Sequence, residues 1–61
     1  MNIQELLKFA PKINFLKITT PLRSFYLHRD HSYMNVIKDC EVKYIDTTEH
    51  GALEVVVEEE V

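Results

Sequence analysis

The chain has 61 residues, a net charge of −3, 46% hydrophobic residues and 28% charged residues. This size and composition predict one small globular domain over residues 1–61 and exclude a disordered chain. Cys40 is the only cysteine, which excludes an internal disulfide and favours a reducing, cytoplasmic location. No signal-peptide pattern is visible, and no apolar run reaches the about 20 residues of a membrane-spanning helix, so no membrane partner is expected.

The charges are divided between two halves of the chain. Residues 1–29 hold five Lys or Arg and one acid, whereas residues 30–61 hold two Lys and nine acids. Such a division fits pairing between segments of one chain, or a dipolar surface that attracts a second copy. Domains that bind nucleic acid normally have a basic face with no cancelling acidic half, so direct nucleic-acid binding is not expected.

Residues 2–10 predict a short helix. Asn2 is a favourable N-cap, and Glu5 stands where its carboxylate can return a hydrogen bond to the cap. Pro11 ends the helix near Ala10, because a residue before proline resists helical angles. The apolar residues spaced for one helix face are Ile3, Leu6, Leu7 and Ala10.

Four segments rich in β-branched and aromatic residues predict strands at 13–19, 23–29, 41–47 and 52–59. Pro21 suits the first connection, and Gly51 can take the positive φ of a tight hairpin loop. This order of elements predicts an α+β domain, with a short N-terminal helix packed on a mostly antiparallel sheet of three to four strands. In the connection 30–40, Ser32 is a candidate cap for one helical turn through Lys38, with Val36 and Ile37 turned inward; an irregular crossover or a further short strand are the alternatives.

Side-chain alternation divides the strand residues between two faces. The predicted core face consists of Leu16, Ile18, Phe25, Leu27, Val42, Tyr44, Leu53, Val55 and Val57. The second face consists of Ile13, Phe15, Lys17, Ser24, Tyr26, His28, Lys43, Ile45, Glu54, Val56 and Glu58.

The second face predicts an interface, because every strand gives it a large apolar side chain and one short helix cannot cover both faces. An apolar centre with a charged rim is typical of protein–protein contacts. Scattered exposed apolar residues on a monomer, or a one-residue error in register, are the alternatives. The candidate interface residues are Ile13, Phe15, Tyr26, Ile45 and Val56.

The stretch LHRDHSYM at 27–34 places two histidines three positions apart with Asp30 between them. The candidate metal ligands are His28, His31, Cys40 and His50. Zinc needs three or four ligands, and the classical patterns use tight pairs that this chain lacks, so we expect a polar strand end and no metal or other cofactor.

An enzyme would use one of these histidines as a base, Asp30 to orient it and Cys40 or a serine as nucleophile. Nothing in the spacing selects these residues, and a single glycine excludes a Gly-rich phosphate loop, so catalysis is not expected. Cys40 is expected to pack as a small apolar residue with its thiol pKa raised by Asp39 and Glu41.

The sequence favours a non-catalytic interaction or regulatory module that forms homo-oligomers through the second sheet face or binds another protein. Its brevity would suit an accessory protein of a phage or mobile element. The first alternative is a decoy that imitates nucleic-acid phosphates and inhibits a nucleic-acid-binding protein, and the second is a small metal-binding protein. The acids of the decoy surface would be Glu41, Asp46, Glu49, Glu54 and Glu58–Glu60.

Overall fold

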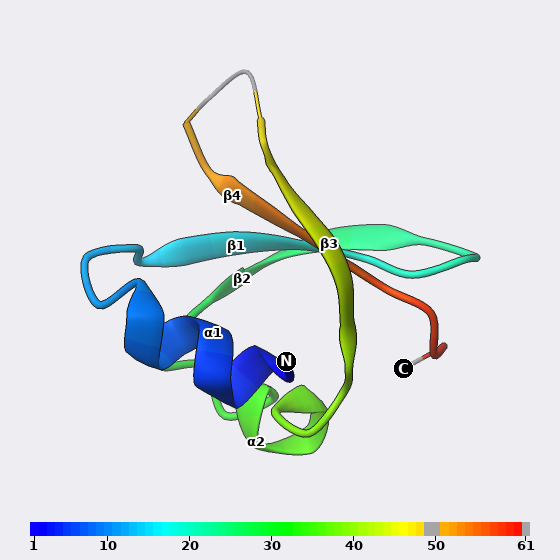
Figure 1. Ribbon diagram of the computed structural model, residues 1–61, viewed down its shortest axis with the longest axis horizontal. Helices are drawn as coiled ribbons and strands as arrows, with labels where there is room; N and C mark the ends of the chain where they lie inside the picture. Colours follow the sequence, from blue (N-terminus) through cyan, green and yellow to red (C-terminus); the bar gives the residue numbers. More distant parts are fainter. Residues whose placement is uncertain (49–50, 61) are drawn as a thin grey trace.

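The computed structural model describes residues 1–48 and 51–60 (Figure 1). Two helices and four strands follow in the order α1 (Ile3–Phe9), β1 (Phe15–Thr19), β2 (Ser24–His28), α2 (Met34–Ile37), β3 (Val42–Thr47) and β4 (Leu53–Val57). No helix in the described ranges has the length and apolar character needed to cross a bilayer.

The four strands form one sheet in the order β2-β1-β4-β3, and the predicted α+β architecture is confirmed. The β1–β2 and β3–β4 pairs are antiparallel, while the two central strands, β1 and β4, run parallel. The segment between β2 and β3 contains α2 and carries the chain across the sheet. Its length agrees with the dozen or more residues that a crossover requires.

The first helix begins as the sequence predicts. The Asn2 side chain accepts a hydrogen bond from the Glu5 backbone N–H at 2.8 Å, and the Glu5 carboxylate accepts one from the Asn2 N–H at 3.1 Å. This reciprocal capping box satisfies two N–H groups that would otherwise lack a partner inside the helix. The helix ends at Phe9, with Ala10 as its C-cap before Pro11.

The other end of α1 is held by Arg29, which follows β2. Its Nη1 donates to the carbonyls of Ala10 at 2.8 Å and Ile13 at 2.9 Å, and its Nη2 donates to the carbonyl of Leu7 at 2.9 Å. A guanidinium therefore caps carbonyls at and beyond the helix C-terminus, where the helix dipole favours positive charge. These contacts tie α1 to the sheet.

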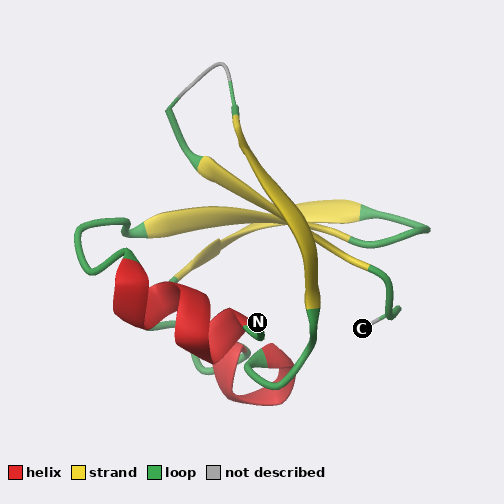
Figure 2. Cartoon of the chain, viewed as in Figure 1, coloured by secondary structure: helices red, strands yellow, loops and turns green. Residues whose placement is uncertain are grey.

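Both helices lie on one side of the sheet (Figure 2). Apolar side chains from α1, α2 and that side of the strands meet in one core, which buries Ile3, Leu6, Leu16, Ile18, Leu27, Met34, Ile37, Cys40, Val55 and Val57. The short helix in 30–40 is present, but Tyr33 rather than Ser32 is its N-cap residue, without a side-chain cap. Ile37 is fully buried, whereas Val36 is 67% exposed, so the prediction that both point inward is wrong for Val36.

The predicted alternation fails in β3, because the strand contains a register shift between Val42 and Tyr44. An extra residue at a bulge moves all later side chains to the opposite face. Tyr44 is therefore paired with Val56 and Ile45 with Val55. Strict alternation predicts Tyr44 on the core face and Ile45 on the second face, and both predictions are wrong.

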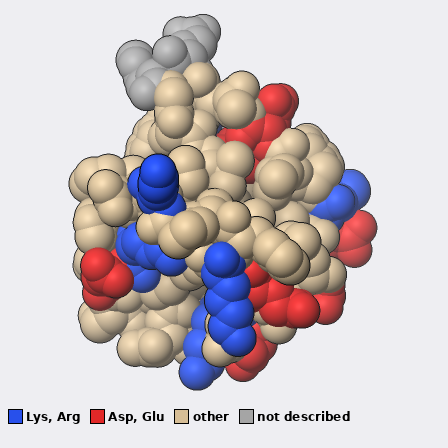
Figure 3. Space-filling model, turned by 60° about the vertical axis from the view of Figure 1, so that its left-hand side comes forward, with Lys and Arg blue, Asp and Glu red and all other residues tan. Residues whose placement is uncertain are grey.

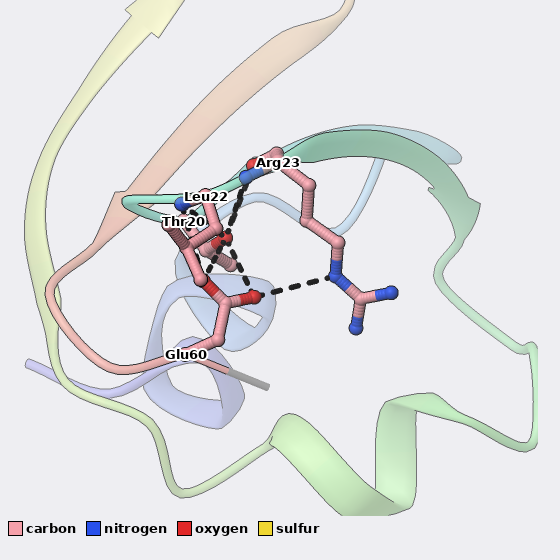
Figure 4. Close-up of polar contacts among 4 residues, drawn as sticks. All are labelled: Thr20, Leu22, Arg23 and Glu60. Atoms are coloured by element: carbon pink, nitrogen blue, oxygen red, sulfur yellow. Dashed lines mark hydrogen bonds and ion pairs between the residues drawn. The ribbon is translucent and has the colours of Figure 1, made fainter.

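The two hairpin connections are stabilised in different ways, one by a glycine conformation and the other by side-chain hydrogen bonds. Gly51, in the β3–β4 connection, has a φ of +78°, as the sequence predicts for a tight loop. At the β1–β2 turn, the carboxylate of Glu60 accepts hydrogen bonds from Thr20 Oγ1 at 2.8 Å and from the Leu22 N–H at 3.1 Å (Figure 4). Arg23 Nε lies 3.4 Å from the same carboxylate. Through Glu60, the segment after β4 is therefore hydrogen-bonded to the β1–β2 turn.

Candidate interaction surface

The sheet has a second side that no described helix or strand covers (Figure 2). We call this side the outer face and define it by the strand residues that alternate with the core residues. These residues are Phe15, Lys17, Thr19, Ser24, Tyr26, His28, Tyr44, Asp46, Glu54 and Val56.

Strand pairing arranges the outer face in rows across the sheet. The central row runs Tyr26, Lys17, Glu54, Asp46, from β2 to β3. The neighbouring row runs Ser24, Thr19, Val56, Tyr44 in the same direction. A third row is formed by Phe15, at the start of β1, and His28, at the end of β2. Their ring centroids lie 4.9 Å apart in an edge-to-face arrangement.

Three aromatic rings on this face are about half exposed: Phe15 at 56%, Tyr26 at 54% and Tyr44 at 55%. Val56 is half-buried and lies between its register partners Thr19 and Tyr44. The structure therefore places Phe15, Tyr26 and Val56 together on the outer face, as the sequence predicts. It adds Tyr44, which the sequence misses because the β3 bulge has no clear sequence signature.

The two remaining candidate interface residues lie elsewhere. Ile13 precedes β1 and packs partly against the core, so its assignment to the second face is wrong. Ile45 shares the side of Val55, at the outermost strand of the sheet, where no described helix covers it and it remains 47% exposed.

The centre of the outer face is polar, contrary to the expected apolar centre with a charged rim. Lys17 and Glu54 are register partners on the two central strands. The Glu54 carboxylate also accepts a hydrogen bond from Thr19 Oγ1 at 2.8 Å. The aromatic rings therefore surround a hydrogen-bonded polar centre.

Charge differs between the two halves of this face. The β1–β2 half carries the cation Lys17, while the β3–β4 half carries the carboxylates of Asp46 and Glu54. The division of charge along the sequence thus becomes a division between the two sides of the outer face.

The two histidines of LHRDHSYM serve the local turns. The Nδ1 atom of His28 accepts the Asp30 backbone N–H at 3.1 Å, and the Nδ1 of His31 accepts the Tyr33 N–H at 3.0 Å. An Nδ1 atom that accepts a hydrogen bond carries no proton, so the Asp30 carboxylate, 3.9 Å from His28, does not form an ion pair with it in this arrangement. This geometry agrees with the expected polar strand end.

The candidate metal ligands do not come together in the part of the chain that the structure describes. No group of three or more His, Cys, Asp or Glu side chains there has the spacing of a metal site. His50 lies outside the described residues. Cys40 is 8% exposed in the core, and burial, with Glu59 and Asp39, raises the pKa of its thiol. The expectation that Cys40 packs as a small apolar residue agrees with its position, but the second acid that raises its pKa is Glu59 and not the expected Glu41.

The acids proposed for a decoy surface are partly engaged within the chain. Glu60 binds the β1–β2 turn, and Glu58 lies 4.0 Å from Lys43 Nζ. On the side shown in Figure 3, positive and negative side chains are interspersed. Glu49 lies outside the described residues. These contacts reduce the acidic surface that would face a basic partner.

Three comparisons with known proteins give no family for this chain: no protein-family model, no curated protein and no solved structure matches it.

Proposed function

We propose that the protein is a small, cytoplasmic, non-catalytic interaction module that self-associates through the outer face of its sheet. The observation that carries this proposal is that three half-exposed aromatic rings surround an uncovered polar centre with charges of both signs. The free energy of the system falls when a partner covers exposed aromatic surface and removes it from water.

Charge favours one arrangement of two copies. A twofold axis parallel to the strands, between β1 and β4, lays β1 of one copy over β4 of the other. Lys17 then faces the partner's Glu54, and the basic half of each outer face meets an acidic half. A twofold axis across the strands would instead place Lys17 over the same residue of the second copy, which like-charge repulsion disfavours.

The size of the face predicts weak association. Four strands at normal spacing, each about five residues long, cover about 300 Å² per copy in plan. Stable dimers bury about 800 Å² per partner, so this face alone suits a contact that forms at high micromolar concentration. The polar centre supports the same conclusion, because Lys17 and Glu54 must lose part of their hydration on association.

Sedimentation equilibrium over a concentration series tests the proposal. The wild type should show a mass that rises with concentration, and Phe15→Glu should remain monomeric because it places a charge among the outer-face rings. Phe9→Glu is the matched control, since Phe9 is 77% exposed on α1, away from the outer face. A wild type that is strictly monomeric at high micromolar concentration, or equal dissociation by both variants, would contradict the proposal.

A further inference from the structure

Beside β2, on the side of the sheet opposite the outer face, an open groove of about 340 Å³ follows the strand. Its lining residues are Arg23, Phe25, Leu27, His31 and Tyr33. Phe25 and Leu27 alternate with the outer-face residues of β2, while His31 and Tyr33 come from the connection toward α2. The groove therefore lies along the edge of the sheet.

The backbone of β2 has a hydrogen-bonding edge directed away from β1. Thr20 N–H donates to the carbonyl of Arg23, and Arg29 N–H donates to the carbonyl of Asn14, each at 2.8 Å. Because bonded positions alternate in an antiparallel pair, the N–H groups of Ser24, Tyr26 and His28 point outward, as do the carbonyls of Ser24 and Tyr26. The His28 carbonyl instead accepts the His31 N–H.

The other sheet edge, β3, has features that discourage strand addition. The Met1 carbonyl accepts the Val42 N–H at 2.8 Å, so the start of β3 is already paired with the N-terminal residues. A bulge follows at Lys43, and Asp46 lies within the strand. Bulges and charges are common protections of edge strands. β2 has neither a bulge nor a carboxylate, lysine or proline within Ser24–His28.

Charge indicates what can occupy the groove. Arg23 lies at one end, with its guanidinium carbon 5.1 Å from the centre of the Phe25 ring, and its Nε already contacts a carboxylate, that of Glu60. His31 Nδ1 accepts a backbone N–H, which directs its proton to Nε2 as a further donor. If β2 of a second copy occupied the edge, Arg23 of one copy would lie near basic side chains of the other copy. An acidic segment instead brings negative charge to Arg23.

We propose that β2 and this groove bind an extended acidic peptide segment of a partner protein, which adds to the sheet as an antiparallel strand. Main-chain bonds form with Ser24 and Tyr26, as in other cases of strand addition. Residues directly opposite each other share a face, so apolar peptide side chains lie against Leu27 and Phe25. An acidic side chain two positions later lies at Arg23. The recognised pattern is apolar-x-apolar-x-acidic.

The probe is a fluorescein-labelled heptapeptide, Thr-Val-Thr-Val-Thr-Glu-Thr, titrated with the full chain and followed by polarisation. Binding with a dissociation constant of about 1 mM or tighter is expected. The same peptide with lysine in place of glutamate should bind about tenfold more weakly, because it loses a charge-assisted contact. In amide NMR spectra the peptide should shift Ser24 and Tyr26 most.

Arg23→Glu should weaken peptide binding about tenfold, because it reverses the charge at the acidic end of the groove. Lys43→Glu is the matched control on the opposite edge: the two side chains are 53% and 55% exposed, and each contacts a glutamate after β4. Ser24→Pro is a second variant, which removes an outward N–H without removing a bond to β1. Circular dichroism confirms that each variant is folded.

Four results would overturn the proposal: no binding of the heptapeptide, shifts confined to other surfaces, equal weakening by Arg23→Glu and Lys43→Glu, or full binding by folded Ser24→Pro. Outer-face association also moves β2 amides, so the concentration series without peptide is recorded on Phe15→Glu, which does not associate through that face. If its β2 amides still shift as the protein concentration rises, the occupant of the edge is a second copy, and the proposal is also wrong.

Discussion

Arg29 provides the sharpest test of how the fold is held together, because one side chain contacts three backbone carbonyls at 2.8–2.9 Å. Arg29→Met keeps an apolar stem of similar length and removes all three hydrogen bonds. Bonds to charged groups contribute about 1.5–3 kcal/mol each, but contributions on one half-buried guanidinium do not add fully. We expect a loss of about 2–3 kcal/mol in the free energy of unfolding.

This loss is large for a domain of this size, whose whole stability is of the order of 3–9 kcal/mol. Urea unfolding followed by circular dichroism measures it directly, and the melting temperature should fall by about 10–20 °C. Arg29→Lys should recover only about 1 kcal/mol, because an ammonium keeps the charge but cannot reproduce the planar fork.

Lys8→Met is the matched control. Lys8 is an exposed cation in the last turn of α1 and reports the general effect of the helix dipole, about 0.3–1 kcal/mol. The reasoning would be refuted if Arg29→Met and Lys8→Met differ by less than about 0.5 kcal/mol. Complete recovery in Arg29→Lys would show that charge alone is sufficient.

Three further changes test local features. Glu60→Ala should lower the unfolding free energy by about 1–2 kcal/mol, because it leaves the buried Thr20 hydroxyl without its carboxylate partner; urea unfolding with Glu59→Ala as control measures this, and equal losses would contradict it. Cys40 has a folded-state pKa above its ordinary value of 9.0, mainly through burial, so its stabilising effect is complete below that pH and declines as pH rises through the folded pKa. Wild type should therefore lose more stability than Cys40→Ala between about pH 8 and 10, and parallel losses would oppose this reading. Gly51→Ala should cost about 1 kcal/mol in the same assay, because φ is +78°, although no atom of the described residues beyond the chain neighbours of Gly51 lies within 4 Å of the added methyl; unchanged stability would count against a backbone origin.

Local signals predict much of the fold. The cap and box of Asn2 and Glu5, the stop at Pro11 and the positive φ of Gly51 depend on neighbouring residues, and all are present. Strand positions are confirmed to within two residues at each end because β-branched and aromatic residues mark them. The parallel pairing of β1 and β4 is a relation between distant segments, which no local pattern specifies.

The errors at the candidate site have a similar origin. A single bulge in β3 exchanges Tyr44 and Ile45 between faces, since alternation propagates any shift along the strand. Ile13 falls on the second face only if the strand extends to residue 13, whereas β1 begins at Phe15. The role of Arg29 could not be derived from its neighbours, because its three acceptors lie 16 to 22 residues away in sequence.

Intermolecular nuclear Overhauser effects in a mixed sample, half isotope-labelled and half unlabelled at millimolar concentration, test self-association through the outer face most directly. Only contacts between copies appear in the filtered spectrum, so contacts between register partners of the same chain do not obscure them. The proposed twofold arrangement predicts contacts between the methyl groups of Thr19 and Val56 of different copies, and between the Phe15 ring and the start of β4. Absence of any intermolecular signal, or signals confined to α1, α2 and the edge of β2, would contradict it.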